Sequence, residues 1–216
     1  MPYFLDNNVL IGYIFETDNW NSKSLEVMGC HIHKISSDTV KAECSDIYQK
    51  NIGKIKKEIL RSIGEINKSK SIKIVDLQLF TNTFYSKDVI LSFINSNLNT
   101  DKSKIINGLR TLLRDTESRC LVNFNSIDKL ITFYKRDRPY KEIYDIFEID
   151  GLTRIDLVDV EIILDAHHIG LQVAELYFIT GDYMHIIPRR DTIKKNTSIK
   201  DVIGLGGFSC PILKDN

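Results

Sequence analysis

Short apolar segments that run directly into an acidic residue recur along this chain and limit the folds open to it. Residues 3–5 precede Asp6 in this way, and residues 176–181 precede Asp182. A third apolar segment is followed by a helical pattern that contains Glu43. Segments of helical periodicity separate these runs, which predicts an α/β chain with a mainly parallel sheet. In such sheets the carboxyl ends of the strands converge on the edge that binds ligands.

Apolar alternation and helix-capping residues predict the individual elements. The predicted strands are residues 2–5, 31–36 and 175–180 with a short strand near Gly204, and the predicted helices are residues 8–15, 38–49 and 153–169. Residues 84–135 are mostly helical by periodicity, with breaks expected near Asn97 and Asn99 and at Gly108, Asp115 and Asn123. One further strand is expected, and two segments are alternatives for it, residues 71–77 or residues 143–149.

Length and composition are those of one compact globular domain. The chain has 216 residues, of which 43% are hydrophobic and 27% are charged. We therefore expect a single domain over residues 1–216, with a helical insertion at about 80–150. Lys plus Arg equals Asp plus Glu at 29 each, so no overall charge attracts a nucleic acid or a membrane.

The four cysteines lack the spacing of a zinc site or a disulfide framework. They are Cys30, Cys44, Cys120 and Cys210, and no two of them form a CxxC pair. The sequence therefore predicts reduced thiols. An acid at position 6 argues against a signal peptide, and no apolar run approaches the roughly 20 residues that span a bilayer. We expect a cytoplasmic protein with no membrane partner.

Four acidic residues are the candidates for chemistry: Asp6, Glu43, Asp159 and Asp182. Carboxylates that gather without a cation repel one another and raise one another's pKa. A site rich in oxygen ligands and poor in histidine suits Mg²⁺ or Mn²⁺. Such ions activate water and stabilise the leaving oxygen in phosphodiester hydrolysis. Structural roles stay open, with Asp6 as a helix N-cap, Asp182 as a turn residue and Glu43 as a surface residue.

Several neighbours of these acids are candidates for supporting roles. Asn8 is placed to hydrogen-bond a carboxylate or to cap a helix, and the Thr180 hydroxyl is placed to orient a carboxylate or a water. Asp156 shares a helix face with Asp159, whereas Asp165 lies about 240° around that helix from Asp159. The paired histidines 167 and 168 fit the last turn of a helix better than a metal site.

A basic helical pattern occupies residues 50–73, with eight basic residues against two acidic ones. Isoleucines and a leucine recur there at helical spacing, so the basic residues share the other face. A solvated helix face is the simpler interpretation. The functional interpretation is a surface for nucleic-acid phosphates. Its candidate residues are Lys54, Lys56, Lys57 and Arg61.

The ordered set of acidic segments resembles the PIN-domain nucleases. Leu5-Asp6-Asn7-Asn8-Val9-Leu10 resembles the opening motif of that family, and Ile35-Ser36 through Glu43 resembles its second segment. Residues 159–166 resemble the third, and Tyr177 to Asp182 resembles the fourth with its Thr-x-Asp ending. The resemblance covers about a quarter of the chain.

This resemblance implies a three-layer α/β/α sandwich around a mainly parallel sheet, with an inserted helical region. It also implies Mg²⁺- or Mn²⁺-dependent cleavage of single-stranded RNA, with Asp6, Glu43, Asp159 and Asp182 as catalytic metal ligands. Some members are toxins of toxin–antitoxin pairs or homodimers, so an antitoxin or other protein partner and a homodimer are further expectations. The 115 residues between Glu43 and Asp159 exceed the spacing in the compact toxins.

Two other functions stay open. The first is a non-catalytic PIN-like module that binds RNA or a protein, in which the acids are incidental. The second is a phosphotransfer or phosphatase domain with a nucleophilic Asp6. That class usually has a second Asp two residues later, where this chain has Asn8.

Overall fold

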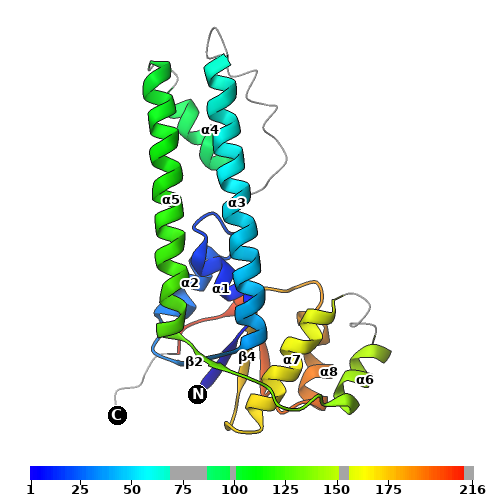
Figure 1. Cartoon of the computed structure of the whole chain (residues 1–216). Coiled ribbons are helices and arrows are strands. Elements are labelled where there is room, and N and C mark those ends of the chain that lie inside the picture. Colours follow the sequence, from blue (N-terminus) through cyan, green and yellow to red (C-terminus); the bar gives the residue numbers. More distant parts are fainter. Residues whose placement is uncertain (69–86, 98–100, 151–155, 212–216) are drawn as a thin grey trace. The chain divides into compact units, whose positions relative to one another are not determined.

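A five-stranded, all-parallel sheet forms the centre of the fold, which belongs to the α/β class. Figure 1 shows the computed structural model, which describes residues 1–68, 87–97, 101–150 and 156–211. The elements of unit 1 and unit 2, defined below, are β1 (Pro2–Leu5), α1 (Asn7–Ile14), α2 (Asn21–Gly29), β2 (His33–Ser37), α3 (Asp38–Lys68), α4 (Lys87–Ser96), α5 (Lys102–Leu130), β3 (Thr132–Tyr134), α6 (Lys141–Ile149), α7 (Leu157–Gly170), β4 (Tyr177–Thr180), η3 (Ile187–Arg189), α8 (Arg190–Asn196), β5 (Asp201–Gly204) and η4 (Leu205–Gly207).

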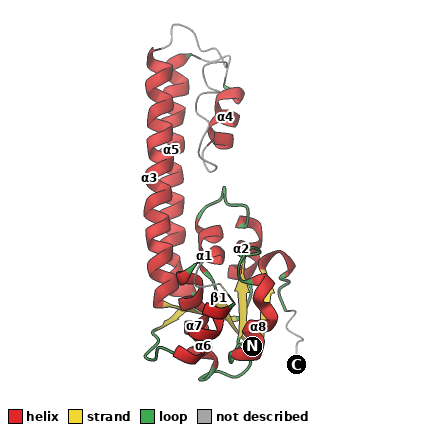
Figure 2. Ribbon diagram, turned by 90° about the vertical axis from the view of Figure 1, so that its right-hand side faces the viewer, coloured by secondary structure: helices red, strands yellow, loops and turns green. Residues whose placement is uncertain are grey.

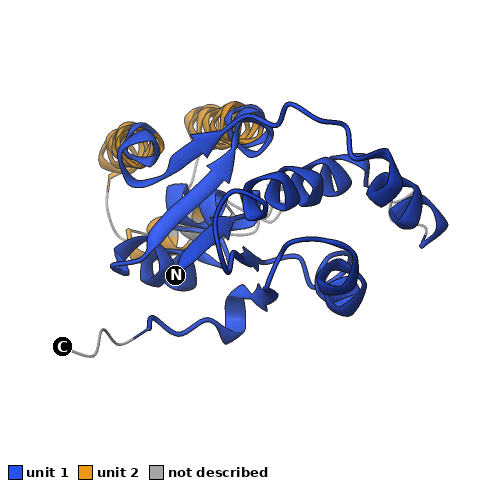
Figure 3. Ribbon diagram, turned by 90° about the horizontal axis from the view of Figure 1, so that it is seen from below, with its two compact units in different colours: residues 1–46, 125–216 blue, residues 47–124 orange. Residues whose placement is uncertain are grey.

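The chain divides into two compact units. Unit 1 comprises residues 1–46 and 125–216, and unit 2 comprises residues 47–124 (Figure 3). All five strands belong to unit 1 and are drawn in yellow in Figure 2. Unit 2 contains α4 and large parts of α3 and α5. The single domain with an insertion at about 80–150 stays a prediction.

The strand order, β3-β2-β1-β4-β5, places β1 at the centre of the sheet. Phe4 and Leu5 are completely buried there, and Phe178 and Ile179 are completely buried in the adjacent β4. Strands covered on both faces are expected to be continuous apolar runs, which is how β1 and β4 stand out in the sequence. The Phe4 and Phe178 rings stack with centroids 5.2 Å apart.

The direction in which the sheet grows reverses at β1. From β1 the chain adds β2 and then β3 on one side, and it returns to add β4 and β5 on the other. Open α/β sheets bind ligands at the carboxyl edge where this reversal occurs. The gap between the ends of β1 and β4 is therefore the position that the topology favours for a site.

The third strand in chain order was not predicted. It is β3, whose three residues follow the long helix α5 directly. Of the two alternatives, residues 71–77 lie outside the described residues, and residues 143–149 are helical, so that assignment is wrong. Ile143 and Phe147 are both buried on α6, four residues apart, which is the spacing of a helix face.

The helix α5 runs unbroken from Lys102 to Leu130, so the breaks predicted near Gly108, Asp115 and Asn123 are wrong. A Cβ atom at Gly108 would lie 2.3 Å from Phe93 of α4. The glycine therefore allows two helices of unit 2 to approach closely and does not end α5. Within the same unit, the rings of Tyr48 and Phe124 stack between α3 and α5 at 4.4 Å.

A disulfide bond joins Cys30, which follows α2, to Cys210 near the end of the described chain. The prediction of four reduced thiols is therefore wrong for this pair, whereas Cys44 and Cys120 are free and buried. The spacing of the cysteines did not predict this bond because 180 positions separate the two bonded residues. Among the described helices, none combines the length and the apolar character needed to cross a bilayer.

Candidate metal site

Asp6 and Asp182 follow the neighbouring strands β1 and β4 at the carboxyl edge of the sheet, where the strand order reverses. Leu5 pairs with Ile179 in register, and the Asp6 amide donates to the Ile179 carbonyl oxygen at 3.0 Å. The parallel pairing therefore carries one residue past the end of β1. It sets the two acidic residues on adjacent strand ends, as the sequence predicts.

Asp6 is 2% exposed, and three donors hold its carboxylate. Oδ1 accepts from the Asn7 amide at 2.6 Å, which caps the N-terminus of α1. Oδ2 accepts from Asn8 Nδ2 at 3.2 Å and from the Thr180 hydroxyl at 2.6 Å. Burial nevertheless raises the pKa of Asp6, against the lowering effect of these hydrogen bonds. Asp6 is thus both a helix cap and a fixed carboxylate of the site.

Asp182 closes a tight turn after β4. Its amide donates to the Thr180 hydroxyl oxygen at 2.9 Å. Its Oδ1 accepts from the amides of Met184 and His185, each at 2.8 Å. The Thr180 hydroxyl therefore links the backbone of Asp182 to the carboxylate of Asp6, and the turn brings the His185 ring to the site.

Gly181 lies between these two residues, and its lack of a side chain is required by close packing. A Cβ atom there would lie 2.8 Å from Trp20 Nε1 and 3.0 Å from Asn8 Cβ. A larger residue at position 181 would displace either the indole ring or the helix that carries Asn8.

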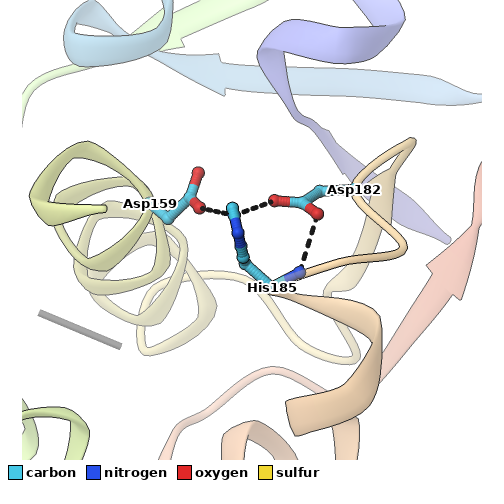
Figure 4. A group of neighbouring side chains, drawn as sticks. All are labelled: Asp159, Asp182 and His185. Carbon is cyan, nitrogen blue, oxygen red and sulfur yellow. Dashed lines mark hydrogen bonds and ion pairs between the residues drawn. The ribbon is translucent and has the colours of Figure 1, made fainter. Parts of the chain in front are cut away.

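The helix α7 supplies Asp159 from its first turn. Asp156 is the N-cap, and its Oδ1 accepts from the amides of Val158 at 2.9 Å and Asp159 at 3.4 Å. Thr153, the predicted cap, lies outside the described residues. This capped turn directs Asp159 toward the turn after β4, as Figure 4 shows.

Asp159, Asp182 and His185 form a compact group in Figure 4. One ligand atom of each lies within 4.8 Å of the others. His185 Nδ1 is 3.5 Å from Asp159 Oδ2 and 3.2 Å from Asp182 Oδ2. Sequence analysis missed His185, although its position three residues after Asp182 places it in the same turn.

Glu43 lies on α3, which begins directly after β2. Burial first, and then the neighbouring charges of Asp6 and Asp156, raise the pKa of its carboxyl group to about 7, against the lowering effect of a hydrogen bond from the Asn7 side chain. The charges of Asp6 and Asp156 act on Glu43, so these three acids lie near one another. Asp156 reaches this group from the N-terminus of α7.

The ionisation of Asp159 is also strongly disfavoured. Burial first, and then the charges of Asp6, Asp156, Asp182 and Glu43 in that order, raise the pKa of its carboxyl group to about 8. The four charged groups that raise its pKa are all carboxylates. Asp6, Glu43 and Asp182 therefore lie close enough to Asp159 to affect its ionisation.

The donor set fits a divalent cation. Carboxylate oxygens predominate, as Mg²⁺ and Mn²⁺ prefer, and His185 adds a nitrogen that Mn²⁺ accepts more readily than Mg²⁺. Asp159 Oδ2 is buried without a hydrogen-bond partner among the described residues. A buried oxygen left without a partner costs stability, and a bound cation would remove that cost.

Other candidates from the sequence have structural partners elsewhere. Asp165 is 3% exposed and receives a hydrogen bond from Arg136 Nε at 2.7 Å, and the same guanidinium pairs with Glu161. His167 Nδ1 accepts from the Ser198 amide at 2.9 Å. His168 Nδ1 lies 2.7 Å from the Tyr140 hydroxyl. These side chains stabilise the packing of α7.

The basic candidates lie on α3 within unit 2, and all four are exposed. They are Lys54, Lys56, Lys57 and Arg61. Ile55, Ile59 and Ile63 are buried on the opposite face, so the predicted amphipathic helix is confirmed. Lys56 lies 3.9 Å from Glu117 of α5. A role for the basic residues in binding RNA stays a prediction.

Comparison of the chain with protein-family models, with curated proteins and with solved structures gave no match. Any functional assignment therefore depends on the site itself and on the sequence motifs that form it.

Proposed function

We propose that this protein is a metal-dependent endoribonuclease of the PIN type, which cleaves single-stranded RNA at a site formed by Asp6, Glu43, Asp159 and Asp182. The supporting observation is the convergence of these carboxylates on Asp159, whose pKa is raised to about 8 by burial and by the charges of Asp6, Asp156, Asp182 and Glu43. Clustered acids that resist ionisation are characteristic of functional sites. The proposal extends the observed parallel sheet to a three-layer PIN-like sandwich.

Mg²⁺ or Mn²⁺ bound by these acids would lower the pKa of an attacking water and offset the negative charge of the phosphodiester. Asp6 is the most fixed of the four ligands because three hydrogen bonds hold its two oxygens. Thr180 and Asn8 orient Asp6, and Thr180 also holds the backbone of Asp182. These contacts preorganise the carboxylates before a substrate arrives.

Cleavage of a mixed RNA pool tests this proposal directly. The assay compares the wild type with Asp6→Asn, Asp159→Asn and Asp182→Asn in Mn²⁺ and in EDTA. Each substitution removes a ligand charge, so we expect cleavage to fall by on the order of 100-fold or more. Asp128→Asn is the matched control, because Asp128 is a half-exposed surface acid that pairs with Lys41. Unchanged cleavage by Asp6→Asn would refute the proposal.

One observation favours the alternative of a non-catalytic PIN-like module that binds RNA or a protein. His185 Nδ1 lies within 3.5 Å of Asp159 Oδ2 and 3.2 Å of Asp182 Oδ2, so the imidazole partners both carboxylates without a metal. Calorimetric titration with Mn²⁺ distinguishes the two functions. Absence of any metal-dependent heat, together with retained RNA binding, would favour the module.

A further inference from the structure

A stacked aromatic pair lies beside the carboxylates. The rings of Trp20 and Tyr183 are 5.5 Å apart between centroids and 19° from parallel. Trp20 immediately precedes α2, and Tyr183 belongs to the turn that Asp182 closes. The pair therefore joins the N-terminus of α2 to the loop that carries His185.

The Tyr183 ring is held at its hydroxyl end as well as at its face. The Gly206 amide donates to the hydroxyl oxygen at 3.0 Å. A Cβ atom at Gly204 would lie 2.4 Å from the same oxygen, so the glycine at the end of β5 leaves room for it. Together with Trp20, these contacts fix the orientation of the ring before any ligand binds.

Despite these contacts, Tyr183 is 43% exposed. One ring face is stacked on Trp20, so the exposed surface lies on the remainder of the side chain. A second stacked pair provides a contrast, because Tyr3 stacks on Tyr177 at 5.4 Å at the amino end of the same two strands. Tyr3 is only 5% exposed, so the Tyr3–Tyr177 pair belongs to the core packing. Tyr183, in contrast, is fixed in orientation at the carboxyl edge and yet remains partly exposed, so completing the core is not its role.

We propose that the outer face of Tyr183, supported by Trp20, stacks on one nucleobase of a single-stranded RNA substrate. This inference rests on the proposed nuclease function. Proteins bind single strands by stacking unpaired bases on aromatic side chains, which duplexes do not offer. The stacked pair of Trp20 and Tyr183, called the platform below, would therefore select single strands over duplexes.

The position of the Tyr183 ring limits which base of the strand can stack on it. Tyr183 directly follows Asp182, and successive Cα atoms are about 3.8 Å apart. A nucleotide whose phosphate lies at the carboxylates would bring its own base, or the adjacent one, to Tyr183. Every base has an aromatic face, so the platform would fix the register of the strand with little sequence preference.

Binding of a labelled single-stranded RNA in Ca²⁺ tests the platform separately from cleavage. We expect Tyr183→Ala to weaken binding by about 5- to 150-fold, which is the range for losing one stacked base. Tyr183→Phe keeps the ring and is expected to bind as the wild type does. Tyr177→Ala is the matched control, since it removes the stacked tyrosine at the start of β4, away from the carboxyl edge, and is expected to leave binding unchanged.

Oligonucleotides with a single abasic residue provide a test that needs no change to the protein. One abasic position is expected to weaken wild-type binding as much as Tyr183→Ala does, and the variant is expected to be insensitive to that position. Equal binding by wild type and Tyr183→Ala, or no sensitive position, would overturn the platform.

The two proposals fail in different ways. Cleavage by the wild type with undiminished binding by Tyr183→Ala refutes the platform and keeps the nuclease. Tyrosine-dependent binding without cleavage supports the platform and refutes the nuclease. Wild-type protein that binds no single strand at all refutes both.

Discussion

Thr180 donates its hydroxyl hydrogen to Asp6 Oδ2 at 2.6 Å, across the two strands at which the sheet reverses its order. The same hydroxyl oxygen accepts from the Asp182 amide at 2.9 Å, so one side chain positions two of the four carboxylates. Thr180 is completely buried, which protects both hydrogen bonds from competition with water.

We expect Thr180→Val to weaken Mn²⁺ binding by about 10- to 100-fold, the usual effect of removing a group that orients metal ligands. Calorimetric titration of the folded variant measures the change. Thr180→Ser retains the hydroxyl and is expected to bind Mn²⁺ like the wild type. If valine left the affinity unchanged, Asp6 would not depend on this contact for its position.

The pH dependence of stability is expected to reverse when metal is added. Because the pKa of Asp159 is raised to about 8 and that of Glu43 to about 7, the folded protein retains protons that the unfolded chain releases near pH 4. This contribution to stability is complete below about pH 4 and is lost as the pH rises toward 8. In EDTA the melting temperature should therefore fall between pH 5 and pH 8.

Asp159→Asn removes the largest of these ionisations and is expected to flatten the fall in EDTA. The proposed site would bind Mn²⁺ through its deprotonated acids, so in the presence of Mn²⁺ the wild type should gain stability with rising pH. Thermal unfolding with Asp128→Asn as the control provides the comparison. A wild type whose melting temperature rises with pH in EDTA would contradict the raised pKa values of Asp159 and Glu43.

A pair on the other side of β4 should show the opposite pH effect. Hydrogen bonds from Arg190 are the largest cause that lowers the pKa of Asp201 to about 2. The stabilisation is present above about pH 4 and is lost as the pH falls toward 2. Arg190→Gln is expected to raise the pKa of Asp201 toward the ordinary range, as measured by NMR titration of the carboxyl carbon. A pKa that stays near 2 would assign the effect to Lys194 and the Val202 amide.

Reduction of the disulfide between Cys30 and Cys210 is expected to lower the free energy of unfolding by about 2–4 kcal/mol. Urea titration with and without dithiothreitol measures the loss. In the variant Cys30→Ser with Cys210→Ser, dithiothreitol should have no further effect. Thiol labelling in denaturant without reductant should find two reactive cysteines, Cys44 and Cys120, and labelling of all four would refute the bond.

The acids of the site were predictable because each depends on a local pattern. Asp6 and Asp182 follow buried apolar strands, and a parallel sheet brings such ends together. His185 was missed because its role depends on a turn that folds back on Asp182, which no periodicity reveals. Asp156 was recognised as a neighbour of Asp159, but its capping role depends on where α7 begins.

The errors in the fold have equally specific causes. The strand β3 has three residues, too few to show an alternating pattern beside the long helix α5. Gly108 suggested a helix break because glycine is a poor helix former, yet Phe93 packs against it. The disulfide was unpredictable because only the folded chain brings its two cysteines together.

The pairing of β1 with β4 also determines when the site can form during synthesis on the ribosome. β1 lies at the very start of the described chain, whereas its partner spans Tyr177–Thr180. Contacts so distant along the chain form late in folding. Asp6 has neither its Thr180 partner nor the Asp182 carboxylate beside it until these residues have left the ribosome. If the protein is the nuclease proposed above, a nascent chain would therefore be unable to cut RNA near the ribosome that is making it.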